Sequence, residues 1–478
     1  MLAAVALALV APMAYAQGSS DVAGEPSIVE RLAALEVEQR RLADSQLQLQ
    51  EEFDEGPGDE LSDELDDALN LRVLNGHTGV QSELSGRIHL DVWGYPSSSP
   101  GVNGFATGDE DTTPQDRIGF RRMRLQASGD LAQDMLYKLE IEFAGGSDVE
   151  FRDAYLGWVD LPVLQTLLIG NQKRPYGLDH LNSSRYNVFI ERPFVIEAFN
   201  QDARRLGVQS YGVSDDEVFN WRYGVFNQRL VQDEGAYISD HWQGQIAGRL
   251  ASVVWWARDG RDFCHAAVSG TWADTDQGAA TNNYAGSGIN EANFRTRPEA
   301  RTTLRWLDTG VIADATDYTL VGLEQVLNVG PLQLVSEQQS VEVRRLGGDT
   351  VHFHGAYGYV SYFLTGEHIP WDRELGLIER VVPNENFYLV DTRCGVKKGL
   401  GAWQVALRWS YLDLADGDIR GGDGQALTAA LNWHWTPYAK LQFNYINGQI
   451  NDNGANAPPG APAFGDYEIL GMRFAVDF

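Results

Sequence analysis

The sequence predicts an all-β protein, a transmembrane antiparallel β-barrel of about 16 strands with a short N-terminal α-helical coiled coil. Two observations predict the barrel. From about residue 85 to the end, apolar and polar residues alternate with a period of two, as on strands with one apolar and one polar face. Beyond residue 16, no apolar run approaches the ~18 residues that a membrane-spanning helix needs. Strands are therefore the only elements available to cross a bilayer.

Residues 1–16 are predicted to be a signal peptide. The stretch from Leu2 to Ala11 is apolar, and Ala14 and Ala16 are small residues that fit signal-peptidase cleavage before Gln17. No Lys or Arg precedes the apolar stretch, which is a departure from the usual signal. The alternative is a buried N-terminal helix. The signal predicts that the mature protein leaves the cytoplasm.

Residues 27–53 are predicted to form a coiled-coil helix. Apolar residues follow a 4-3 spacing once Gln39 and Gln46 are placed in the same frame. The apolar positions are Ile28, Leu32, Leu35, Leu42, Leu49 and Phe53. Two polar core positions lower stability but can fix register and oligomer number, which favours a small homo-oligomeric stalk. The alternative is a single amphipathic helix that lies on another surface.

Residues 54–84 are predicted to be an acidic linker. The segment 21–67 carries 16 acidic and 3 basic residues, and Gly56-Pro57-Gly58 interrupts its most acidic part. Self-repulsion keeps such a segment solvated. The whole chain has a net charge of -30, which excludes nucleic acid as a partner because phosphate backbones are bound by clustered Lys and Arg.

Residues 85–478 are assigned to the barrel. The clearest strand places Trp403, Leu407 and Trp409 on one face against Gln404 and Arg408 on the other. In lipid every backbone group must be paired, so many alternating strands have to close into a cylinder. Trp and Tyr lie towards several strand ends, where an interfacial aromatic girdle belongs. The final strand ends in an aromatic residue, which is the usual recognition signal for outer-membrane barrel assembly.

Connections between strands differ in length. The dipeptide Thr436-Pro437 is typical of a short periplasmic turn. The segments 95–116, 274–300, 366–399 and 447–466 are rich in Gly, Asp, Asn and Pro and are predicted to be extracellular loops.

Three stretches resemble the phosphate-selective porin O and P family, and the resemblance runs from about Arg121 to Phe478. The first stretch is Phe120-Arg121-Arg122-Met123-Arg124-Leu125, followed by Tyr137-Lys138-Leu139-Glu140 and Asp153-Ala154-Tyr155-Leu156-Gly157. The second runs from Arg174-Pro175-Tyr176-Gly177-Leu178 to Arg205-Leu206-Gly207-Val208. The third pairs residues 361–367 with residues 401–414.

The resemblance implies an outer-membrane porin, a homotrimer of 16-stranded barrels that lets small hydrophilic solutes diffuse passively. In the family a loop narrows each pore and basic side chains line an anion path. The segment 174–204 is too long for a turn and lacks alternation, so it is the candidate constriction loop. By alternation, Arg122 and Arg124 point into the lumen. The candidate anion-binding residues are Arg121, Arg122, Arg124, Lys173, Arg174, Arg185, Arg192, Arg204 and Arg205.

Other interpretations stay open at this point. These cations could be ordinary lumen charges paired with Asp and Glu, or the barrel could anchor a coiled coil that binds cell-wall material. A barrel enzyme is the remaining alternative, and no GxSxG, HExxH or GxxxxGK motif occurs. His352 and His354 lie on the same strand face, but no carboxylate or other third ligand follows at a spacing typical of a zinc site. No metal site and no cofactor is therefore predicted.

Overall fold

The computed structural model describes residues 81–478 except 133, 146–148, 201–202, 231–241, 276–291, 393–394 and 452–463. The predicted signal peptide, the coiled-coil helix and all but the last residues of the acidic linker lie outside these described residues. The first strand begins at Gln81, four residues before the predicted barrel boundary, because residues 81–84 already pair with the next strand from Gln81↔Asp130 onwards.

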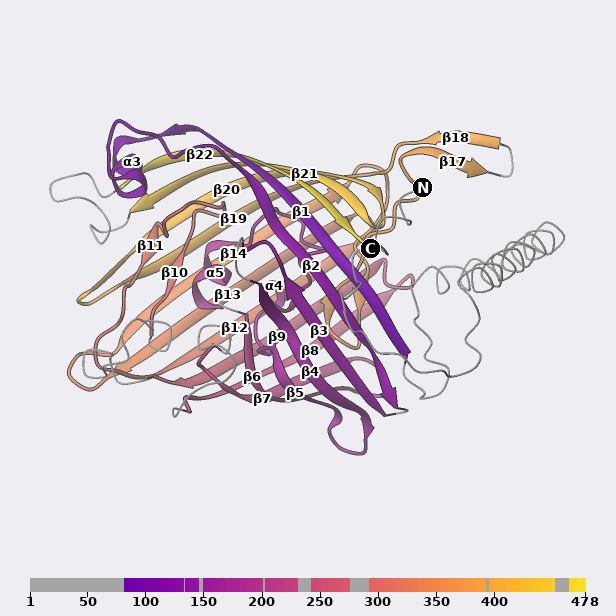
Figure 1. Ribbon diagram of the computed structural model, residues 1–478, viewed down its shortest axis with the longest axis horizontal. Helices are drawn as coiled ribbons and strands as arrows, with labels where there is room; N and C mark the ends of the chain where they lie inside the picture. The colour runs from indigo at the N-terminus through magenta and orange to yellow at the C-terminus, as the bar shows by residue number, and fades with distance from the viewer. Residues whose placement is uncertain are drawn as a thin grey trace, which may run out of the picture. The chain divides into compact units, whose positions relative to one another are not determined.

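Sixteen antiparallel strands form a closed barrel in sequence order, and the first strand pairs with the last through contacts such as Leu90↔Phe474 (Figure 1). The prediction of a barrel of about 16 strands is confirmed. The barrel strands are β1 (Gln81–Ser98), β2 (Arg117–Ala132), β3 (Met135–Glu142), β4 (Glu150–Leu161), β5 (Gln165–Lys173), β6 (Arg204–Val213), β7 (Phe219–Asn227), β8 (Gly244–Ala257), β9 (Asp262–Asp274), β12 (Ala315–Val329), β13 (Leu332–Arg345), β14 (Val351–Phe363), β19 (Ala402–Asp416), β20 (Ile419–Thr436), β21 (Ala439–Asn451) and β22 (Phe464–Asp477).

The carboxyl-terminal residue seals the junction between β22 and β1. The Phe478 N–H donates to the Gly86 carbonyl at 3.1 Å, and the Gly86 N–H donates to the Phe478 carbonyl at 2.6 Å. A Cβ atom at position 86 would lie 2.5 Å from the Phe478 ring. It would also lie 2.8 Å from the Arg124 carbonyl oxygen, so glycine, which has no Cβ atom, fits at position 86 without displacing either group.

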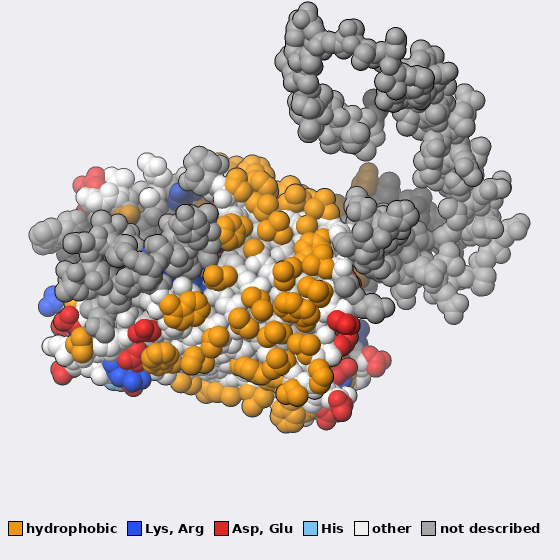
Figure 2. Space-filling model, turned by 60° about the horizontal axis from the view of Figure 1, so that its bottom comes forward, with side chains coloured by type: hydrophobic (Ala, Val, Ile, Leu, Met, Phe, Trp, Pro, Cys, Tyr) orange, Lys and Arg blue, Asp and Glu red, His pale blue; other side chains and the backbone are white. Residues whose placement is uncertain are grey.

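The two faces of the strands separate as the alternation predicts. On β19, Leu407 and Trp409 face outward and are 44% and 47% exposed, whereas Arg408 faces the lumen and is 2% exposed. Figure 2 shows hydrophobic side chains over the middle of the outer face, with charged side chains gathered towards the two ends. This apolar belt is the surface that a bilayer requires of a spanning barrel. No helix among the described residues is long and apolar enough to cross a membrane.

One of the four predicted long loops leaves from the opposite end of the barrel. The connection 364–401 follows β14, which runs back to the end where the short turns 330–331 and 437–438 lie. The prediction that 366–399 is an extracellular loop is therefore wrong, because length alone does not tell which end of a strand a connection leaves. The other three long connections leave from the end opposite the short turns.

Three connections fold into the lumen. The first, here called the lumen segment, follows β5 and is described at residues 174–200 and 203. It carries α4 (Leu178–Leu181) and α5 (Phe194–Phe199), which Figure 1 shows inside the barrel. The second, residues 292–312, contains the two-stranded sheet β10 (Arg295–Thr296) and β11 (Leu307–Asp308). The third is residues 366–381, here called the strap, with β15 (Trp371–Asp372) and β16 (Leu377–Ile378).

Smaller elements lie at the barrel ends. The helix α3 (Pro100–Thr107) follows β1, and the two-stranded sheet β17 (Tyr388–Thr392) and β18 (Gly395–Gly399) follows the strap. Inside the barrel, the three inward connections pack on inward-facing apolar side chains such as Phe226, Phe263 and Phe353. The Trp371 ring of the strap, for example, lies 5.1 Å from that of Phe263. This apolar core occupies part of the lumen and leaves cavities against the wall formed by β1 to β7.

Candidate pore lining

A cavity of about 360 Å³ lies inside the barrel between β1 to β7, the segment 174–203 and the strap. We call it the turn-side cavity, because the strap enters it from the end with the short turns. Its lining contains nine basic and four acidic residues. The basic residues are Arg87, Arg122, Arg124, Lys138, Lys173, Arg185, Arg192, Arg204 and Arg222, and the acidic residues are Glu140, Asp153, Asp372 and Glu379.

A second cavity of about 420 Å³ lies against β1 to β4, nearer the end with the long loops. We call it the loop-side cavity. Its lining has five basic and three acidic residues, namely Arg117, Arg121, Arg152, Arg297 and Arg301 against Asp91, Glu142 and Glu150. Arg124 links the two cavities, because its Nε donates to Glu142 at 2.6 Å and its Nη1 donates to Glu140 at 2.8 Å.

A β-bulge in β2 directs two consecutive arginines into the lumen. His89 pairs with Arg122 and Leu90 pairs with Phe120, so Arg121 has no partner in the register. Such a bulge re-aims a side chain that alternation would send outward. Arg121 consequently reaches Glu191 in the lumen segment, with Nε to Oε1 at 2.6 Å, while Arg122 still lines the turn-side cavity.

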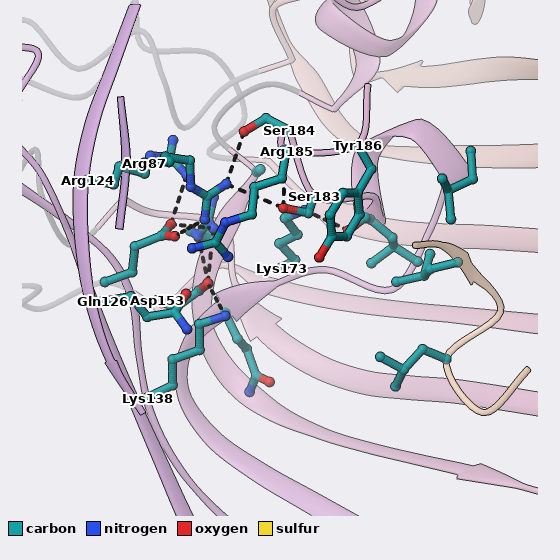
Figure 3. A pocket seen from close by; sticks show the side chains of 18 of the residues that line it. Arg87, Arg124, Gln126, Lys138, Asp153, Lys173, Ser183, Ser184, Arg185 and Tyr186 are labelled. Atoms are coloured by element: carbon teal, nitrogen blue, oxygen red, sulfur yellow. Dashed lines mark hydrogen bonds and ion pairs between the residues drawn. The ribbon is translucent and has the colours of Figure 1, made fainter. Parts of the chain in front are cut away.

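The inward-facing basic side chains of β1 to β7 that line the turn-side cavity are here called the basic wall. Glu140 lies at the centre of this wall. Its side chain is 1% exposed and accepts hydrogen bonds from Arg124 at 2.8 Å, Arg204 at 3.0 Å and Arg87 at 2.5 Å. Asp153 adds a second carboxylate, which Arg204 Nε approaches to 2.6 Å. In Figure 3, Arg87, Arg124 and Lys138 gather with Asp153 on one side of the cavity. Shared pairing of this kind allows several guanidinium groups to be packed closely in a desolvated site.

Arg473 of β22 ties the lumen segment to the wall beside the loop-side cavity. Its Nε donates to Asp91 at 2.7 Å and its Nη2 donates to Glu191 at 2.9 Å. Burial alone would raise the pKa of Glu191, but the guanidinium groups of Arg121 and Arg473 hold it well below its usual range. The charge of Arg121, together with burial, lowers the pKa of Arg301 to about 9. Cations in this cavity are therefore close enough to destabilise one another.

The candidate residues of the lumen segment have structural contacts as well. Lys173 Nζ donates to the carbonyls of Leu181 and Asn182 at 2.7 Å and 2.9 Å, at the end of α4. Arg192 Nη2 donates to the same Asn182 carbonyl at 3.2 Å. Both basic groups thus hold the fold of the segment while they line the turn-side cavity.

Among the basic residues of the turn-side cavity, Arg122 and Arg222 have the fewest contacts that offset their positive charge. Within the described residues, Arg122 has no ion pair, and its Nε is buried without a hydrogen-bond partner. Arg222 donates to the Leu375 carbonyl at 3.3 Å and lies over the Tyr211 ring at 5.0 Å, with no carboxylate ion pair in the described chain.

The nine candidate residues predicted from the sequence fall into three groups in the structure, according to the cavity that each lines. Six of them line the turn-side cavity, namely Arg122, Arg124, Lys173, Arg185, Arg192 and Arg204, and Arg121 lines the loop-side cavity. The other two line neither. Arg174 Nη1 lies 3.3 Å from Gln245 Oε1, and Arg205 Nε donates to the Gln228 carbonyl at 2.6 Å, so both are directed towards β7 and β8.

Sequence reasoning missed several lining residues. Lys138 lies at an inward position of β3, opposite the apolar set Tyr137 and Leu139, so the alternation rule applied to Arg122 could have found it. Arg87 could have been found in the same way on β1. Arg297 and Arg301 belong to an inward connection without periodicity, and no local signal marks them.

The family described as phosphate-selective porin O and P matches residues 83–478. A protein of Caulobacter vibrioides, described as an uncharacterized protein, is 26% identical over 406 residues, which cover 82% of this chain and 73% of that protein.

Three solved structures of similar proteins each give a TM-score of 0.48. OmpT of Vibrio cholerae in its trimer form is 11% identical, with 84% of this chain and 100% of that chain covered. The outer-membrane channel DcaP of Acinetobacter baumannii is 10% identical, with 85% and 100% covered. An anion-selective porin from Comamonas acidovorans is 12% identical, with 83% and 99% covered. Since the family match spans nearly all of the closed barrel, this chain belongs to the phosphate-selective porin O and P family and is an outer-membrane porin channel.

Proposed function

We propose that this porin conducts anions, phosphate-like anions among them, in preference to cations, and that the segment 174–203 with the basic wall opposite it forms the constriction. The observation that carries the proposal is the lining of the turn-side cavity, which has nine basic and four acidic residues in a chain whose net charge is -30. A strongly acidic protein that concentrates cations at one internal site raises the local concentration of anions there.

The position of the lumen segment supports this assignment. It leaves from β5 and crosses the barrel, so that Asn432 of β20 donates to the Val188 carbonyl at 2.8 Å. Gln442 of β21 donates to the Asn187 carbonyl at 3.1 Å. The segment therefore lies against β20 and β21. The space that remains for solutes is the cavity along the basic wall of β1 to β7.

Assembly and export are part of the same proposal. We propose a homotrimer in which each barrel has its own pore, with the heptad pattern at 27–53 as its coiled coil and residues 1–16 as the signal peptide. The heptad positions Ile28, Leu32 and Leu35 support the stalk, and the two polar core positions favour a defined oligomer number.

The test of anion preference is the reversal potential of the purified protein in a planar bilayer under a KCl gradient. We expect a sign that reports chloride as the more permeant ion, and we expect added phosphate to reduce the chloride current. A reversal potential of the opposite sign would contradict the proposal.

Acidification should increase the preference for anions. Burial raises the pKa of both Asp372 and Glu379, which line the turn-side cavity from the strap. A carboxyl group whose pKa is raised loses its negative charge at a higher pH than usual, so lowering the pH from 7 to about 4.5 makes the cavity more positive. The permeability ratio of chloride to potassium should rise over this interval. In the double variant Asp372→Asn/Glu379→Gln, the ratio should already be raised at pH 7 and should change less on acidification.

A further inference from the structure

We infer that the turn-side cavity selects, among anions, those that carry a hydrocarbon body, such as a carboxylate with an alkyl chain or a ring. This inference rests on the proposed anion preference and adds the class of solute. It follows from the unlike chemistry of the two sides of the cavity.

One side of the cavity is basic and is built by the barrel wall, with Arg87, Arg122 and Arg204 among its residues. The other side is built by α4 and the strap. It carries the apolar side chains Leu181, Leu375, Leu377 and Ile378, beside the strap carboxylates Asp372 and Glu379. In Figure 3, the side of the cavity away from Arg87, Arg124 and Lys138 carries side chains drawn wholly in carbon. An anion held by the guanidinium groups therefore has an apolar surface opposite it.

The apolar side is held in place by polar contacts of the strap backbone. The Gly376 carbonyl accepts from Arg249 Nη2 at 3.0 Å, and the Ile378 N–H donates to Asn182 Oδ1 at 3.1 Å. Leu375 and Leu377 are only half-buried, so part of their apolar surface is left open to the cavity. The backbone contacts of the strap hold these two leucines in place. Their open apolar surface can therefore contact a solute in the cavity.

An inorganic anion gains nothing from this apolar side. Phosphate binds to cations and keeps its remaining hydration, whereas a hydrocarbon group that displaces water from Leu375 and Leu377 gains free energy roughly in proportion to the area covered. The cavity volume of about 360 Å³ also falls within the range of about 300 to 1,000 Å³ that is typical of sites for small organic ligands. The combination of guanidinium groups and leucines suits an amphiphilic organic anion.

The experiment uses the full-length protein in planar bilayers and the sodium salts of formate, acetate, butyrate, hexanoate and benzoate, with phosphate as the inorganic comparison. Half-blocking concentrations of the chloride current are measured for each. A fully buried methylene group is worth about fourfold in affinity. Because the cavity is open, we expect at least a tenfold gain from acetate to hexanoate, with benzoate similar to hexanoate.

Two variants locate the effect. Leu375→Ser and Leu377→Ser should each reduce the gain from acetate to hexanoate to about threefold or less. Val382→Ser is the matched control, because Val382 follows the strap directly, is 60% exposed and does not line the cavity. The wild-type series gives an answer even if a strap variant fails to assemble.

The outcomes separate this inference from the proposal on which it rests. Equal half-blocking concentrations along the carboxylate series, with a reversal potential that still reports anion preference, would overturn the inference and leave the anion preference standing. A cation-selective reversal potential would overturn both. A chain-length gain that is the same in the two leucine variants and in wild type would place the contact elsewhere and would also overturn the inference.

Discussion

Replacement of Arg122 by Glu is expected to lower the chloride-to-potassium permeability ratio on the order of fivefold. The substitution changes the charge of the turn-side cavity by two units at a residue that has no ion pair within the described chain, so no carboxylate loses its partner. Opposite charges a few Å apart inside a protein interact by several kcal/mol before screening, and salt in a hydrated pore reduces this to a several-fold effect. The measurement is the reversal potential in a KCl gradient.

The matched control for this prediction is Arg420→Glu. Arg420 is exposed at the start of β20 and lines neither cavity, so the same change in total charge should leave the permeability ratio within about twofold of wild type. An equal fall of the ratio in both variants would show that the net charge of the barrel, and not the turn-side cavity, sets selectivity.

Replacement of Glu140 by Gln is expected to act in the opposite direction on selectivity and to destabilise the barrel. Glu140 accepts from Arg87, Arg124 and Arg204, and removal of a buried partner leaves uncompensated charge at a cost of about 3 kcal/mol or more. The cavity also loses one of its four carboxylates, so the preference for anions should increase. The temperature at which the folded barrel converts to the unfolded form on heat-modifiability gels reports the first effect, and the reversal potential reports the second.

Glu83→Gln serves as the control for Glu140→Gln. Glu83 is an exposed residue on β1, and the same chemical change there should alter neither the transition temperature nor the permeability ratio. If Glu140→Gln were as stable as the control, the three guanidinium groups would not depend on this carboxylate for their close packing.

Much of the barrel could be predicted because alternation is a local property of a strand. Arg122 and Arg124 were assigned to the lumen from the apolar character of Met123 and Leu125, and the structure gives both arginines inward positions. The same rule gave the outward position of Leu407 and the inward position of Arg408. A residue's face depends only on its neighbours in sequence, so no knowledge of the tertiary structure was needed.

Other features of the candidate site depend on information that the local pattern does not contain. Arg121 enters the lumen because of a bulge whose position is set by pairing with β1. Lys173 and Arg174 are neighbours in sequence, yet only Lys173 lines the turn-side cavity, because the chain leaves the strand between them. The prediction that 366–399 is an extracellular loop is wrong because the length of a connection does not tell which end of a strand it leaves.

The contacts of Arg473 connect the beginning, the middle and the end of the chain. This side chain lies on the last strand and holds both Asp91 of the first strand and Glu191 of the lumen segment. Glu191 gains its bond to Arg473 only when the last strand, β22, is in place. The lumen segment therefore reaches its full set of contacts with the wall only after the last strand has joined the barrel, although Arg121 of β2 also binds Glu191.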